Sequence, residues 1–245
     1  MVKHALLCAL LLALPASAFG AGLNLAWNDC GPAGNYNKTF ACNTNSADHE
    51  MIVSFDPPTV IPDANGIQCI LDLRSVSSTL PSWWQFVNAG SCRMASLTAR
   101  TDPRSCVDTW QGHGMPSIAA YQVTANNPSL PTNRARIVSA VALPASQTAA
   151  VEPGIEYFGI GIRINSAKTV GAGACGGCDV PLCIILSELI ITAPGSVWAI
   201  TNPLNSHFVT WQGGLESAIE LNGYGCPGGS PAVNRTWGMI KSIYR

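Results

Sequence analysis

Apolar and polar residues alternate with a period of two in many short runs, and this pattern limits the possible folds more than any other feature of the chain. Successive side chains of a strand point to opposite faces of a sheet, so such a run predicts a strand with one buried face. The clearest example spans 156–164. There Phe158, Ile160, Ile162 and Ile164 fall on one face, opposite Tyr157, Gly159, Gly161 and Arg163.

Further runs of this kind, separated by Pro-, Gly- and Asn-rich turns, predict strands at 23–27, 51–55, 67–73, 84–87, 94–98, 118–123, 136–143, 183–192 and 208–211. Many short strands with such turns predict an all-β fold, a single β-sandwich or jelly-roll-like domain over residues 19–232. After Asn234 the apolar residues Trp237, Ile240 and Ile243 recur at helical spacing, which predicts a short C-terminal helix over 233–245.

The first residues have the pattern of an export signal. A basic start at Lys3 is followed by an apolar run of about ten residues and then by the small residues that precede Ala18. A membrane-spanning helix needs roughly 20 apolar residues, so the run is too short for an anchor. We therefore expect residues 1–18 to be a signal peptide cleaved after Ala18, and the protein to be secreted or periplasmic.

Charge and hydropathy argue against two classes of partner. The chain carries 13 basic and 14 acidic residues without a basic run that could follow a phosphate backbone, so nucleic acid is not an expected partner. The longest apolar stretches, 184–186 and 189–191, are interrupted by Ser187 and Glu188, so no membrane span is expected.

Cysteines are frequent for a chain of this length. There are ten, and loss of Cys8 with the leader leaves nine, an odd number that favours disulfides with one thiol left over. Pairing of near neighbours predicts the bonds Cys30 to Cys42 and Cys92 to Cys106. Cys69 is expected to stay unpaired, because it lies within a strand-like run where a small apolar side chain packs in a core.

The densest chemical feature is Cys175-Gly-Gly-Cys178, followed by Cys183. Such thiolates can bind zinc or an iron–sulfur cluster, or can act as a redox pair. We favour structural disulfides with Cys226 as a partner, because exported thiols are normally oxidised and only one paired knuckle is present. No metal and no other cofactor are expected.

The candidate binding residues are four tryptophans and one histidine: Trp83, Trp84, Trp110, His113 and Trp211. In a strand, one of two neighbouring tryptophans could be exposed and stack on a sugar or a partner, although a core position is the favoured interpretation. Trp110 and Trp211 stand in two copies of Thr-Trp-Gln-Gly, interpreted as strand ends running into glycine turns, and His113 lies between two glycines.

No pattern specifies a reaction. There is no Gly-x-Ser-x-Gly elbow, and a glycosidase carboxylate pair cannot be recognised from one sequence. Asp48-His49-Glu50 places carboxylates beside an imidazole, but neighbouring residues of an extended chain point to opposite faces. A solvated turn is the favoured interpretation of this tripeptide, and no catalytic residue is predicted.

The tail from Thr236-Trp237-Gly238 through Lys241 to Tyr244-Arg245, together with Cys175, Cys178 and Cys183, resembles segments of uncharacterised exported bacterial proteins. The resemblance implies a bacterial, exported origin and carries over no catalytic residue. The leading hypothesis is a non-catalytic module that binds a glycan or a protein or has a structural role. A secreted hydrolase on the same fold is the alternative, and a metal or redox protein built on the three cysteines is the third.

Overall fold

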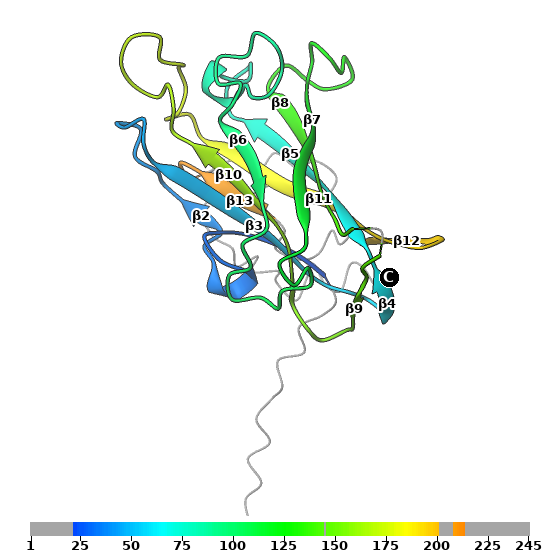
Figure 1. The fold of residues 1–245 in the computed structure, drawn as a ribbon. Helices are drawn as coiled ribbons and strands as arrows, with labels where there is room; N and C mark the ends of the chain where they lie inside the picture. The colour runs from blue at the N-terminus through cyan, green and yellow to red at the C-terminus, as the bar shows by residue number, and fades with distance from the viewer. Residues whose placement is uncertain (1–21, 145, 201–207, 214–245) are drawn as a thin grey trace, which may run out of the picture.

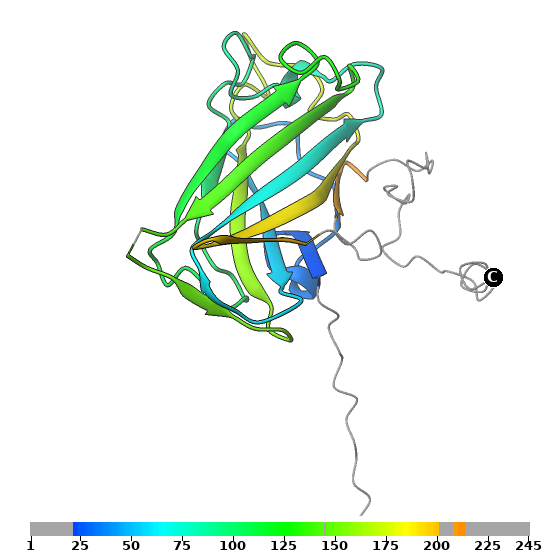
Figure 2. The ribbon, with the colours of Figure 1, turned by 90° about the vertical axis from the view of Figure 1, so that its right-hand side faces the viewer.

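The structure is a computed structural model, and it describes residues 22–144, 146–200 and 208–213. Two sheets lie face to face, one of four antiparallel strands and one larger, which is antiparallel except for one parallel pair (Figure 1). Figure 2 shows the larger sheet as a layer of strands side by side, with the smaller sheet behind it. The predicted all-β sandwich is therefore confirmed.

The smaller sheet has the strand order β1 (Gly22–Trp27), β3 (Asp48–Asp56), β10 (Tyr157–Asn165) and β6 (Leu97–Arg100). All its pairs are antiparallel. Its inner face carries Leu25, Met51, Val53, Ile160 and Ile162, all of them fully buried. Its outer face is more polar, with Asp48, Glu50 and Arg163, and the buried Ile52 also lies there. This difference between the two faces follows from the alternation in the sequence.

The larger sheet is built on two long strands, β5 (Gly66–Ser75) and β11 (Leu182–Ala193). Beyond β5 lie β8 (Arg134–Ala142) and β7 (Met115–Val123). Beyond β11 lie β13 (Phe208–Trp211), which pairs in parallel with β2 (Asn37–Lys38), and β12 (Ser196–Ile200). A separate pair, β4 (Ile61–Ala64) with β9 (Ala149–Val151), lies at one end of the sandwich (Figure 1).

Two bulges reset the alternation along long strands. In β11, Leu186 pairs with Leu71 and Glu188 with Ile70, so Ser187 is an extra residue. The buried positions change there from even numbers to odd ones, because a shift of one residue turns every later side chain to the other face. Gly159 is the corresponding extra residue of β10. Phe158 therefore lies opposite Ser54, and its predicted place on the face of Ile160 is wrong.

Most of the predicted strands are confirmed, with two exceptions. Residues 84–87 form no strand, since a 3₁₀ turn, η2 (Ser82–Trp84), occupies that segment. The run predicted at 94–98 becomes a strand only from Leu97, since Met94 lies in the preceding turn. The short strands β2, β4, β9 and β12 were not predicted, and neither was a second 3₁₀ turn, η1 (Gly31–Ala33).

Three disulfides join distant segments: Cys30 to Cys106, Cys42 to Cys178 and Cys92 to Cys175. The predicted pairing of near neighbours is wrong, because stacking of the two sheets brings together loops that are far apart in the sequence. Cys183 is also disulfide-bonded. Cys69 is free and fully buried, and burial raises the pKa of its thiol.

Several predictions fall on residues outside the described part of the chain: the signal peptide 1–18, the disulfide partner Cys226 and the helix over 233–245. Among the described residues, no helix is long and apolar enough to cross a membrane. Disulfides persist in oxidising compartments, so the three bonds indicate an extracellular or periplasmic protein.

Candidate functional site

The four candidate tryptophans are core residues. Trp83, Trp84 and Trp211 are 0% exposed and Trp110 is 1% exposed. This burial agrees with the favoured interpretation of Trp83 and Trp84 as core residues, and neither indole is exposed for stacking. In η2 the two side chains do not alternate across a sheet, and the 166–169 segment covers Trp83, whose Nε1 donates to Thr169 Oγ1 at 2.9 Å.

Trp211 lies at the centre of an aromatic cluster that fills one end of the sandwich. Its ring is 4.1 Å from that of Phe40, 4.9 Å from that of Trp83 and 5.1 Å from that of Trp84, measured between centroids. Its Nε1 donates to the Cys178 carbonyl at 2.6 Å, so the cluster is tied to the disulfide of that residue. Its place at the end of β13 agrees with the predicted strand end, whereas Trp110 lies in a turn.

One charged side chain is buried against this cluster. Arg93 is 1% exposed, and its guanidinium lies 3.5 Å from the centroid of Trp83. It donates to the backbone carbonyls of Trp83, Asn165 and Ala167. Burial lowers the pKa of Arg93 to about 9. Since these partners are backbone groups and a ring face, Arg93 holds loops together and offers no charge to a ligand.

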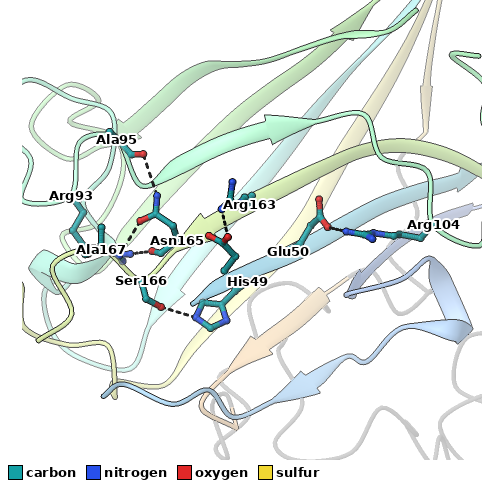
Figure 3. Close-up of polar contacts among 10 residues, drawn as sticks. His49, Glu50, Arg93, Ala95, Arg104, Arg163, Asn165, Ser166 and Ala167 are labelled. Atoms are coloured by element: carbon teal, nitrogen blue, oxygen red, sulfur yellow. Dashed lines mark hydrogen bonds and ion pairs between the residues drawn. The ribbon is translucent and has the colours of Figure 1, made fainter. Parts of the chain in front are cut away.

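His49 points into the same interior from β3. Its Nε2 lies 3.0 Å from Ser166 Oγ, a contact between groups that could be a base and a nucleophile (Figure 3). Ser166 is 1% exposed and His49 7%, so a substrate cannot reach them. Desolvation lowers the pKa of His49 to about 4, and the imidazole is therefore neutral near pH 7. This pair is structural.

The residues on either side of His49 point the other way, as expected for an extended chain. Asp48 and Glu50 lie on the outer face of β3 in a polar groove of about 370 Å³. The tripeptide is therefore the start of a strand and not the predicted solvated turn. Across the same face lie two cations, Arg163 from β10 and Arg100 from β6. The groove residues are Asn28, Asp48, Glu50, Arg100, Asp102, Arg104 and Arg163.

Ion pairs organise most of these charges. Arg104 contacts Glu50 (Figure 3). Arg104 also lies 3.3 Å from Asp102, and Arg163 contacts Asp48. The hydrogen bond from Arg104 to Glu50 raises the pKa of the Arg104 guanidinium. In the described part of the chain, Arg100 takes part in no ion pair, and the buried Glu50 Oε1 has no hydrogen-bond partner. The groove thus offers one cation and one acceptor that are not used internally.

Gly161 has no side chain, and the Glu50 carboxylate occupies the space beside it. A Cβ at Gly161 would lie 2.8 Å from Glu50 Oε1, closer than such contacts occur, so a larger residue there would displace the carboxylate. The wall of the groove is also fixed. Cys30 is bonded to Cys106, and Asp29 Oδ1 accepts from the amide and the hydroxyl of Ser105 at 2.9 and 2.7 Å. These contacts hold the loop that carries Asp102 and Arg104 over the sheet.

The structure brings two of the candidate binding residues together. Trp110 and His113 line a second cavity of about 340 Å³, together with residues from the loop between β8 and β9. Trp83, Trp84 and Trp211 lie elsewhere, in the aromatic cluster. Sequence reasoning missed the charged groove, because its members come from β3, β6, β10 and two loops. The available signal was the alternation itself, which places Asp48 and Glu50 on one face.

Cys175 and Cys178 are bonded to Cys92 and Cys42, respectively, and Cys183 is also oxidised. Cys175 and Cys178 are therefore not bonded to each other as a Cys-x-x-Cys redox pair would be, and this bonding favours the structural interpretation of the three cysteines. Within residues 22–144, 146–200 and 208–213, no group of three or more His, Cys, Asp or Glu side chains is arranged to hold a metal ion.

Comparison with known proteins yields only a distant likeness. No protein-family model matches the chain, and no curated protein matches it. Among solved structures, the chain is similar to a cohesin module from a family 33 glycoside hydrolase of Clostridium perfringens, with 8% identity and a TM-score of 0.31. The match covers 74% of this chain and 97% of that one.

Proposed function

We propose that this protein is a non-catalytic binding module that acts outside the cytoplasm and recognises a protein partner through the charged groove. The observation that supports it is the arrangement of three acidic and three basic side chains on one rigid sheet face, with Arg100 left unpaired. Complementary arrays of charge give an interface specificity and speed of association.

A polypeptide fits this groove better than a neutral sugar does. Side chains of both signs within a short segment can meet Arg100 and the Asp102 carboxylate, whereas a neutral glycan carries no charge to offer. Stacking on aromatic rings, the usual contact with a sugar face, is absent from this groove, since its lining contains no aromatic residue.

The hydrolase alternative has less support. Each carboxylate of the groove contacts an arginine, so its acidic groups are arranged as ion pairs. The contact between Ser166 and His49 is enclosed in the core. A glycosidase needs one carboxyl group beside the leaving oxygen and a second that activates water or attacks, and the groove pairs its acids with cations instead.

The test begins with a random-peptide display selection against the purified protein. Peptides selected by the groove are expected to carry charges of both signs, and Arg100→Glu should weaken their binding at least tenfold. Lys168→Glu is the matched control, because it makes the same change of charge on an exposed loop residue outside the groove. Binding to Arg100→Glu as tight as to the natural sequence would exclude the groove as the docking site.

Ionic strength gives a second readout of the same contact. Binding through exposed charges is screened over about 8 Å at physiological salt. We therefore expect the selected peptides to associate more slowly with the natural sequence and to bind it more weakly as salt rises, and to show a weaker salt dependence with Arg100→Glu. Equal salt dependence in both proteins would contradict the proposal.

A further inference from the structure

Cys183 lies on the outer face of the larger sheet, which is the face toward the viewer in Figure 2. It pairs with Arg74 of β5 and with Thr210 of β13, and directly paired residues of neighbouring strands carry their side chains on the same face. Leu182 and Ile184, on either side of it, are fully buried in the core between the sheets. The Cys183 side chain therefore points away from the smaller sheet.

The disulfide partner of Cys183 follows from an account of the other cysteines. Cys183 is disulfide-bonded. Six of the other described cysteines form the three bonds given above, and Cys69 is free. The sequence then leaves only Cys8 and Cys226. Since Cys8 belongs to the predicted signal peptide, Cys226 is the partner that a mature chain can supply.

The length of chain after β13 is sufficient for this bond. Thr210 pairs with Cys183 and lies three residues before Gly213, so the 214–245 segment begins within about 15 Å of Cys183. Thirteen residues lead from Gly213 to Cys226, and an extended chain of that length spans up to about 40 Å. A disulfide needs Cα atoms roughly 5.5–6 Å apart, which this segment can provide.

The outer face is closed to water at this point. Cys183 and Thr210 are 0% and 2% exposed, although both point away from the smaller sheet. The next outward positions along the two strands are Ile185 and Phe208, which pair with each other and are half-buried. Apolar side chains beside a buried disulfide are stabilised by a cover that keeps water from them.

The charges of this face and of the following segment are complementary. Arg74 and Arg134 pair with each other on the outer face, and the pKa of Arg74 is lowered by its burial and by the charge of Arg134. The 214–225 segment carries Glu216 and Glu220 and no basic residue, so it can offer carboxylates to these arginines. Its apolar residues are Leu215, Ala218, Ile219, Leu221 and Tyr224.

We propose that a disulfide between Cys183 and Cys226 fastens the C-terminal segment to the outer face of the larger sheet, where the 214–225 segment covers Ile185 and Phe208. The charged groove lies on the outer face of the smaller sheet, so this inference does not depend on the proposed function. The docked segment closes one outer face of the sandwich and leaves the other face to a partner.

Disulfide mapping tests the bond in the natural sequence. Proteolysis of the exported protein without reductant, followed by mass spectrometry, should yield a peptide pair that joins Cys183 to Cys226. A bond from Cys183 to Cys8 or to a second copy of the chain, or a free thiol at Cys226, would overturn the proposal. Cys69 is the internal control for alkylation, because its buried thiol should react only after unfolding.

The rate of reduction tests the cover separately. Attack on a disulfide requires access to its sulfur atoms, so the segment should protect this bond from dithiothreitol. Ile185→Glu and Arg74→Glu each place a negative charge under the acidic segment, and each should speed reduction of the bond to Cys183 at least tenfold. Val197→Glu is the matched control, because Val197 is 66% exposed on β12, and it should change the rate less than twofold.

The two measurements distinguish the bond from the cover, and both from the groove. Reduction that is as slow in Ile185→Glu and Arg74→Glu as in the natural sequence would show that the segment does not cover this face, and would overturn the proposal. Arg100→Glu lies on the other sheet and should leave the rate of reduction unchanged.

Discussion

The two faces of β3 show opposite ways of placing charge in one sandwich. On the inner face, His49 is neutral, and the Arg93 cation packed against the same core bonds to carbonyl groups and a ring. On the outer face, Asp48 and Glu50 pair with arginines in the charged groove, and Figure 3 shows the contact of Glu50 with Arg104. Polar groups in the core are there for structure, whereas those in the groove remain available to a partner.

The largest expected effect is at Arg93. Its removal leaves three carbonyl groups without their donor and deletes the contact with Trp83, so Arg93→Ala should lower the free energy of unfolding by about 4 kcal/mol. Arg100→Ala is the matched change in the groove and should alter stability by less than about 0.5 kcal/mol. Urea unfolding at pH 7 measures the loss of stability in both variants. Equal losses would contradict the difference proposed between the core and the groove.

The second effect concerns pH. As pH falls through 6.5 the unfolded chain binds a proton at His49, but the folded protein does so only near its pKa of about 4. Stability is therefore present above pH 6.5 and decreases between pH 6.5 and 4, by up to about 3 kcal/mol from this group.

The matching variants isolate that contribution. In His49→Gln, the loss of stability between pH 6.5 and 4 should be smaller than in the natural sequence. His113→Gln removes an exposed histidine and should retain the full loss. Urea titrations at several pH values decide the matter, and a pH profile unaffected by His49→Gln would refute the assigned cause.

A smaller effect is expected at Arg104. Glu50 is only 12% exposed in its side chain, so Arg104→Ala leaves a largely enclosed carboxylate without its cation. We expect a loss of about 1 kcal/mol, which should decrease when Glu50 is also replaced by Gln. Thermal unfolding of the single and double variants measures the coupling, and strictly additive losses would argue against it.

The smallest effect is expected for the pair of Arg163 with Asp48. Their side chains are 29% and 43% exposed, and such pairs contribute little in water. Asp48→Asn should change the free energy of unfolding by less than about 0.5 kcal/mol, and 1 M salt should remove the difference. If urea unfolding shows a loss of stability above about 1 kcal/mol, this ion pair stabilises the fold in the way that the buried contacts of the inner face do, and the comparison is wrong.

The sequence predicted the strands because burial on one face leaves a direct record in the alternation of residues. The sequence did not predict the structure where the conformation depends on tertiary contacts and not on the local pattern of residues. Neither the bulge at Ser187 nor the turn at Trp83 and Trp84 has a signal in single-residue propensities. A glycine inside a strand-like run is a recognised bulge signal, but the one at Gly159 was not used. Each depends on contacts with segments that are distant in the chain.

The candidate site was less predictable than the fold. Glu50, Arg100 and Arg104 become neighbours only when β3 and β6 are both paired to β10 and Cys30 is bonded to Cys106. The tryptophans were candidate binding residues in the sequence, but in the structure they are core residues. Their size makes them valuable for packing, and the core of this sandwich takes up the four that sequence analysis had marked as candidates.

The order of the disulfides bears on how the protein is made. No bond among the described cysteines joins neighbours in the sequence. Cys42, for example, cannot form its native disulfide before Cys178 is present. A chain threaded N-terminus first into an oxidising compartment presents Cys30 and Cys42 to each other before Cys106 emerges. An oxidant acting alone could join that premature pair, so we expect the yield of the protein to depend on thiol exchange by a disulfide isomerase.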